Sequence, residues 1–148
     1  MKETIGEMNG LLRGEADRHS IKIHTELGAD TPNIQANRVQ LQQVFMNLML
    51  NAIEAMKDTG GILTIRSRMN PEGRLIVSIS DTGIGLPAQS TEQIFDPFHT
   101  TKPQGTGMGL TITRSIVESY GGRVWATANE GAGATFHFIL PGETEAHV

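Results

Sequence analysis

Cysteine is absent from this chain, which excludes disulfide bonds, thiolate metal sites and a thiol nucleophile. An excess of positive charge is absent too: the formal net charge is −4, whereas non-specific binding of nucleic acid requires clustered Lys and Arg. No apolar run approaches the roughly 18 residues of a membrane-spanning helix, and the first residues lack the apolar stretch of a secretory signal. We therefore expect a cytoplasmic domain that contacts neither nucleic acid nor a membrane directly.

Size and composition are those of a globular domain. The 148 residues fit one ordinary domain that can bury a core, and 38% apolar with 19% charged residues is typical of a soluble one. We expect a single domain over 1–148, with a core over about 20–140, an N-terminal helix over 1–18 and a tail over 141–148. Glycine is in excess, with 17 residues concentrated in the second half.

Hydrophobic periodicity predicts the order of helices and strands. Apolar residues at helical spacing indicate helices over 2–18, 37–57 and 108–120, with Asn37 as the N-cap of the second. Alternation of apolar and polar residues indicates strands over 21–27, 62–69, 74–80, 123–128 and 134–140. The result is an α/β (α+β) two-layer sandwich, in which a mixed, mostly antiparallel sheet carries helices on one face.

The long helix over 37–57 is apolar around most of its circumference, so we expect it to be buried nearly all round. Its polar residues fall in a strip about 60° wide. Within this strip Asn47 and Asn51 lie one turn apart, where two side chains can converge on one object. A carboxamide oxygen is a suitable ligand for Mg²⁺. The alternative is a thin stripe that simply faces solvent.

A first glycine-rich segment, Asp81-Thr82-Gly83-Ile84-Gly85, follows the strand over 74–80. Its glycines let a ligand approach the backbone closely. A carboxylate only accepts hydrogen bonds, so Asp81 suits the exocyclic amine of adenine and rejects the carbonyl of guanine. The alternatives are an Asx-type turn that needs glycine geometry and a dinucleotide fingerprint. The fingerprint is disfavoured because no long helix starts here.

A second segment, Gly105-Thr106-Gly107-Met108-Gly109-Leu110, leads directly into the helix over 108–120. Backbone N–H groups and the helix dipole make such a start suitable for phosphate. The alternative is a flexible surface loop. Lys102, just before it, is either a phosphate contact or a solvated side chain. The phenylalanines at 95 and 98 suggest a lid over bound nucleotide, and the alternative for each of them is ordinary core packing.

Taken in order, these segments resemble the N, G1, F and G2 boxes of sensor histidine kinases, and Gly131-Ala132-Gly133-Ala134-Thr135-Phe136 is similar to their G3 element. The resemblance spans about 38–140. It implies the Bergerat-type ATP-binding sandwich shared with the gyrase, Hsp90 and MutL ATPases. The cofactors implied are ATP and Mg²⁺.

The resemblance also implies a role for each matching residue. Asn51 would ligate Mg²⁺, with Asn47 near the same ion and beside the phosphates, and Asp81 would bind the adenine amine. Asn47 and Lys102 would be the catalytic residues, although Lys57 is a second candidate for neutralising the γ-phosphate. The remaining nucleotide contacts would come from Gly83, Gly85, Thr101, Gly105, Gly107, Met108, Gly109 and Leu110, and from Thr135, which would close the adenine pocket.

The departures from the family concern the reaction. None of the five histidines is followed by the acidic residue usual after a phosphoacceptor. We therefore expect the catalytic half of a histidine kinase, monomeric in isolation, which phosphorylates a separate dimerisation and phosphoacceptor domain that in turn serves a response regulator. The domain is expected in the cytoplasm whether or not its parent is anchored in the inner membrane. The alternatives are a related ATPase, an anti-sigma-type serine kinase and a nucleotide-sensing module without chemistry.

Overall fold

The computed structural model of the chain describes residues 2–28, 37–83, 109–129 and 133–141. Over these residues it contains three helices and five strands. The helices are α1 (Lys2–Arg18), α2 (Arg38–Met56) and α3 (Gly109–Ser119), and the strands are β1 (Ile21–Leu27), β2 (Gly61–Met69), β3 (Leu75–Ser80), β4 (Arg123–Ala128) and β5 (Ala134–Leu140). Every helix and strand expected within these residues is present, with bounds shifted by one residue or two.

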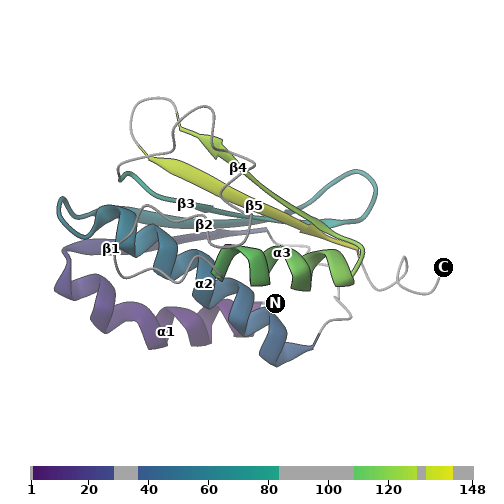
Figure 1. Cartoon of the computed structure of the whole chain (residues 1–148), viewed down its shortest axis with the longest axis horizontal. Coiled ribbons are helices and arrows are strands. Elements are labelled where there is room, and N and C mark those ends of the chain that lie inside the picture. Colours follow the sequence, from purple (N-terminus) through teal and green to yellow (C-terminus); the bar gives the residue numbers. More distant parts are fainter. Residues whose placement is uncertain (1, 29–36, 84–108, 130–132, 142–148) are drawn as a thin grey trace.

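The strands form one sheet in the order β1-β2-β3-β5-β4. The β1–β2 pair is parallel and the other three pairs are antiparallel. Figure 1 shows α1, α2 and α3 together on one side of this sheet. The predicted two-layer sandwich, with a mixed, mostly antiparallel sheet, is therefore confirmed.

Local capping explains where α2 begins. The Oδ1 atom of Asn37 accepts hydrogen bonds from the backbone N–H groups of Val39 and Gln40, at 2.8 and 3.1 Å. These N–H groups belong to the first turn of the helix, where backbone N–H groups have no acceptor within the helix. The Oη atom of Tyr120 accepts from the backbone N–H of Asn37 at 2.8 Å, so the start of α2 is also tied to the residue that follows α3.

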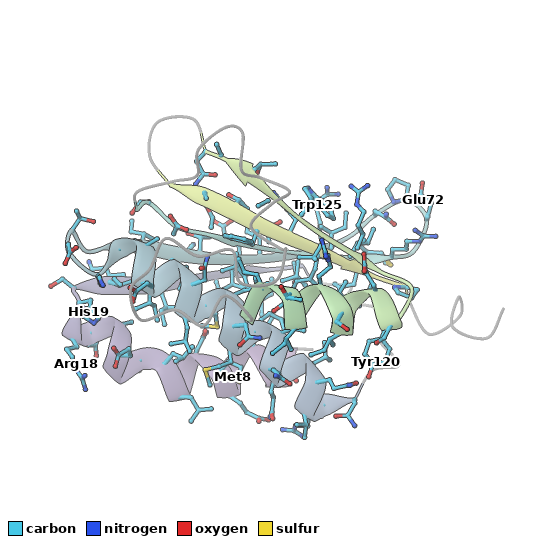
Figure 2. All side chains as sticks on the ribbon, viewed as in Figure 1. Met8, Arg18, His19, Glu72, Tyr120 and Trp125 are labelled. Atoms are coloured by element: carbon cyan, nitrogen blue, oxygen red, sulfur yellow. The ribbon has the colours of Figure 1, made fainter. Side chains whose placement is uncertain are left out.

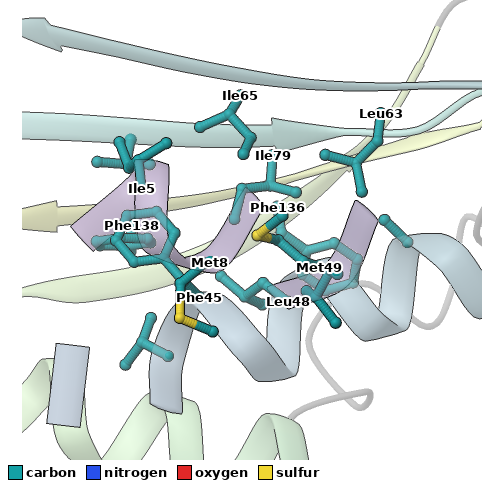
Figure 3. Packing of buried hydrophobic residues seen from close by; sticks show 14 of the residues in the cluster. Ile5, Met8, Phe45, Leu48, Met49, Leu63, Ile65, Ile79, Phe136 and Phe138 are labelled. Carbon is teal, nitrogen blue, oxygen red and sulfur yellow. The ribbon is translucent and has the colours of Figure 1, made fainter. Parts of the chain in front are cut away.

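The core lies between the sheet and the helices. Figure 3 shows Phe45 of α2 against Phe138 of β5, and their ring centroids lie 5.5 Å apart in an edge-to-face arrangement. The apolar face of α1 joins the same core through Ile5, Met8, Leu12 and Ala16. Edge-to-face aromatic pairs add stability beyond the area that they bury.

One expectation about α2 is wrong. The helix is not buried nearly all round, because Val39 and Leu50 are 69% and 41% exposed. The sheet, α1 and α3 cover only part of its circumference, so apolar character alone overstated the burial. None of the described helices is both long and apolar enough to cross a membrane.

Candidate functional site

Asp81 follows directly after β3, and its side chain is buried, with 2% exposure. Its Oδ1 atom accepts hydrogen bonds from the backbone N–H groups of Gly83 and Ala134, at 2.9 and 3.2 Å. Its own backbone N–H donates to the carbonyl oxygen of Ala134 at 2.9 Å. N–H donors compensate a buried carboxylate for the loss of water. The acid is thus held in a fixed orientation where β3 meets β5.

Two glycines allow the backbone around Asp81 to pack closely. A Cβ atom on Gly83 would lie 2.3 Å from the carbonyl oxygen of Ala55. Gly133, with a φ of +95°, would place a Cβ 2.0 Å from the carbonyl oxygen of Asp81. Neither site admits a side chain. Because Ala55 lies one helical turn beyond Asn51, the Asp81–Gly83 segment and the asparagine-bearing helix meet at the C-terminal end of α2.

Thr82 strengthens the same junction. Its Oγ1 atom accepts a hydrogen bond from the backbone N–H of Ile62, at 3.2 Å, and its own N–H points at the sulfur of Met56, at 3.4 Å. The segment after β3 is therefore attached to β2 as well as to α2.

Asn47 joins α2 to the start of α3. Its Nδ2 atom donates to the carbonyl oxygen of Gly109 at 3.1 Å and to Oγ1 of Thr113 at 3.3 Å. The Thr113 hydroxyl is fully buried and donates to the same carbonyl oxygen at 3.0 Å. Because the nitrogen makes both hydrogen bonds, Oδ1 is the amide atom that suits a cation.

Thr135 is placed differently from the role that the resemblance implied. Its Oγ1 atom donates to Oδ1 of Asn129 at 2.6 Å and lies 3.0 Å from Oγ of Ser80. In β5 the side chains of Ala134 and Phe136 point to the core, so Thr135 points to the opposite face of the sheet. The residue of β5 whose backbone meets the Asp81 carboxylate is Ala134.

The remaining expected site residues are only partly described. Gly109 and Leu110 form the first turn of α3, and Leu110 packs against the core. Six others lie outside the described residues: Gly85, Thr101, Lys102, Gly105, Gly107 and Met108. Among the described side chains, no three His, Asp or Glu gather into a group that could hold a metal ion.

Lys57, a candidate cation for phosphate, forms an exposed ion pair. Its Nζ atom lies 2.8 Å from Oε1 of Glu54, and this hydrogen bond raises the pKa of Lys57 above its usual value. The pair lies at the exposed C-terminal end of α2, where such contacts contribute little. The structure thus places a carboxylate of α2 beside the ammonium of its C-cap residue, Lys57.

Sequence reasoning missed two residues of this region. Asn129 donates through Nδ2 to the carbonyl oxygen of Asp81 at 2.9 Å, which connects β4 to the site. In the sequence it is only a residue of the turn between β4 and β5. Thr113 could have been identified from the sequence as a buried polar residue, because it shares the buried face of α3 with Val117, four residues later.

The profile of the family "Histidine kinase-, DNA gyrase B-, and HSP90-like ATPase" matches residues 36–144, which include every described residue of the site. The chain belongs to this family.

Individual relatives agree with the family assignment. Sensor protein FixL of Bradyrhizobium diazoefficiens is 37% identical over 146 residues, which are 98% of this chain and 29% of the relative. The catalytic domain of histidine kinase ThkA superposes with a TM-score of 0.86 at 34% identity, covering 99% of this chain and 95% of that domain. The chain therefore has the size and fold of a histidine kinase catalytic domain, and spans less than a third of the length of FixL.

A further structure of ThkA contains a second protein. In complex with the response regulator protein TrrA, ThkA matches this chain with a TM-score of 0.83 at 32% identity, over 98% of this chain and 41% of the kinase chain. That complex describes what ThkA binds.

Proposed function

We propose that residues 1–148 are one ATP-binding catalytic domain of a sensor histidine kinase. With Mg²⁺, it transfers the γ-phosphate of ATP to a histidine on a separate dimerisation and phosphoacceptor domain. The observation that carries the proposal is the placement of the buried Asp81 carboxylate beside α2, the helix that presents Asn47 and Asn51. Membership of the ATPase family and the match to a kinase catalytic domain support it.

In this proposal Asp81 recognises adenine. Two backbone N–H groups occupy its Oδ1 atom and fix the carboxylate plane. An ionised carboxylate has no proton to donate, so it accepts from the exocyclic amine and repels a carbonyl at the same position. The site thereby selects adenine over guanine.

The donor set on α2 and α3 fits a metal-bound triphosphate. Asn51 and Asn47 would hold Mg²⁺ through their amide oxygens, and the ion supplies neutralisation of negative charge on the phosphates. Gly109 and Leu110 begin α3, whose N-terminal N–H groups and dipole suit phosphate. Lys102 and the Gly105–Met108 backbone would complete the phosphate contacts, and Thr101 and Gly85 would line the nucleotide.

Catalysis here needs positioning more than covalent chemistry. The catalytic role of Asn47 is to align the phosphates, since its amide is neither acid nor base. The related ATPases typically have a glutamate base where this chain has Asn47. Because the amide of Asn47 cannot take a proton from an attacking water, this residue favours phosphotransfer over hydrolysis. Lys102 would stabilise the charge that develops on the γ-phosphate.

The nucleophile would be an imidazole of the acceptor domain, and the phosphoryl group would pass on to a response regulator. Because ATP is its substrate, we place the domain in the cytoplasm. Because this proposal assigns dimerisation to the separate acceptor domain, we expect the isolated chain to be monomeric.

The test is to mix the chain with ATP labelled at the γ-phosphate, Mg²⁺ and a separately produced acceptor domain of a homologous histidine kinase. We expect a phosphoprotein whose label is lost in acid and retained in base, as for phosphohistidine. The Asp81→Asn variant should lose the signal, and Glu72→Gln, the same chemical change on the exposed hairpin, should keep it. Acid-stable label would indicate a serine kinase, and absence of label with ATP bound would indicate a nucleotide-sensing module.

A further inference from the structure

The face of the sheet that points away from the helices carries an ordered array of side chains. In Figure 2, Trp125 lies on this side, whereas Met8 and Tyr120 lie on the helical side. The strand register aligns two rows across β2, β3, β5 and β4, which we call the outer face. One row is Arg66, Ser78, His137 and Trp125, and the next is Arg68, Ile76, Ile139 and Arg123.

The centre of the outer face is held rigidly. The imidazole of His137 has a hydroxyl partner on each nitrogen: Oγ of Ser78 lies 2.9 Å from Nδ1, and Oγ1 of Thr127 lies 3.0 Å from Nε2. The ring stacks on Trp125 with centroids 5.1 Å apart and planes 14° apart. The guanidinium of Arg123 lies 4.7 Å from the centre of the Trp125 ring. A preordered surface loses little side-chain entropy when it binds.

The charge of the outer face is opposite to that of the whole chain. The chain carries a net charge of −4. Among the described strands, this face presents four cations (Lys22, Arg66, Arg68 and Arg123) and one carboxylate, Glu26. Glu26 pairs with Arg66, whose Nε lies 2.5 Å from Oε2.

Arg68 and Arg123 lie at the two ends of the second row of the outer face, on either side of its two isoleucines. Within the described part of the chain neither forms an ion pair, and both are exposed. Between them lie Ile76 and Ile139, half-buried side chains of the same row. Two accessible guanidinium groups on either side of an apolar strip are complementary to carboxylates on either side of an apolar residue.

The distance between the two arginines restricts the sequence that the partner can have. Arg68 and Arg123 are separated by three strand-to-strand steps, or about 14 Å between their backbones. In an extended segment, residues i and i+4 point to the same side and lie about 13–14 Å apart, with residue i+2 midway between them. We propose that the outer face docks an extended acidic segment of a partner protein, with two carboxylates four residues apart and an apolar residue midway. The acids would pair with Arg68 and Arg123, and the apolar residue would cover Ile76 and Ile139.

The test uses the full chain and the synthetic peptide Ser-Glu-Ser-Leu-Ser-Glu-Ser, blocked at both ends. Trp125 is the single tryptophan of the chain, so its emission reports on the centre of the outer face. We expect saturable binding by anisotropy of labelled peptide, together with a change in Trp125 emission. A peptide of the same composition with adjacent glutamates should bind at least about threefold more weakly, because it can satisfy only one arginine. Binding should also weaken as salt rises from about 0.02 to 0.3 M.

Matched variants distinguish peptide binding at the outer face from non-specific attraction by the positive charges of the chain. Arg68→Glu and Arg123→Glu should each weaken peptide binding at least about fivefold, because an attraction becomes a repulsion. Arg13→Glu and Arg18→Glu change the net charge equally on α1 and should leave binding unchanged. All four variants should bind ATP with the affinity of the unchanged chain. A result against the peptide site would therefore leave the proposed kinase function untouched.

Several outcomes would overturn the proposal. These are absence of saturable binding at millimolar peptide, equal binding of a peptide with lysines in place of glutamates, and unchanged binding by the Arg68→Glu variant. Preference for single-stranded DNA or for anionic lipid vesicles over the acidic peptide would likewise show that the cations serve a different partner.

Discussion

Replacing Asp81 by asparagine tests the adenine assignment most directly. The amide has almost the shape of the carboxylate. Its oxygen can still accept hydrogen bonds from the N–H groups of Gly83 and Ala134, which lie 2.9 and 3.2 Å from Oδ1 of Asp81. Its nitrogen then takes the place of the second carboxylate oxygen. A position that only accepts hydrogen bonds becomes one that only donates them.

The expected loss of ATP affinity follows from the hydrogen bond to the adenine amine that the substitution removes. A hydrogen bond to a charged acceptor contributes about 1.5–3 kcal/mol, which corresponds to about 10- to 150-fold in affinity. ATP presents an amine at this position and should bind Asp81→Asn more weakly by that factor. Inosine triphosphate presents a carbonyl instead, so its affinity should rise relative to that of ATP. The structural cost should stay near 1 kcal/mol, because both backbone donors keep an acceptor.

Titration calorimetry with ATP and with inosine triphosphate, each with Mg²⁺, measures both effects. Glu72→Gln is the matched control, since it makes the same change on an exposed side chain of the turn between β2 and β3. Unchanged ATP affinity in a folded Asp81→Asn variant would refute the adenine assignment. An equal loss for both nucleotides would show that the carboxylate supports the pocket without reading the base.

Three further predictions concern stability. Asn37→Ala should destabilise the fold by about 1 kcal/mol in urea unfolding through loss of the α2 cap, and Asn37→Asp should not. Phe138→Ala should cost about 3–5 kcal/mol in the same assay, because it removes a fully buried ring that packs against Phe45. Burial lowers the pKa of His137 below its usual 6.5, with the charge of Arg68 adding to the effect. The folded state therefore binds this proton more weakly than the unfolded state, so stability is full above pH 6.5 and declines as the pH falls below that value. Replacement by His137→Gln should flatten that part of the profile, and an unaltered slope would contradict the assignment.

The outline of the fold was predictable because its signals are local. The cap at Asn37, the turn of Asn70 and Gly73, and the alternation along β5 each act within a few residues. The strand order β1-β2-β3-β5-β4 and the parallel pairing of β1 with β2 were not predicted, because the β1–β2 and β3–β5 pairs join residues about 40 and about 55–65 positions apart.

Burial was harder to predict than helix or strand. Leu11 and Leu50 fit the apolar spacing of their helices, yet they are 68% and 41% exposed. Helical spacing tells which residues share a side, whereas burial depends on how far a neighbouring element extends over that side. The orientation of Thr135 has the same origin, since a single step along a strand exchanges the two faces of a sheet.

The sequence by itself determined the residue types and their order: an acid after a strand, two asparagines one turn apart, and glycines before a helix. These follow from backbone geometry and donor chemistry, which act over a few residues. Only the tertiary structure decided that Gly83 meets Ala55, that Asn47 meets Thr113 and that Arg68 faces the same side as Arg123. Such contacts arise from the packing of elements far apart in the chain, and packing is a property of the whole core.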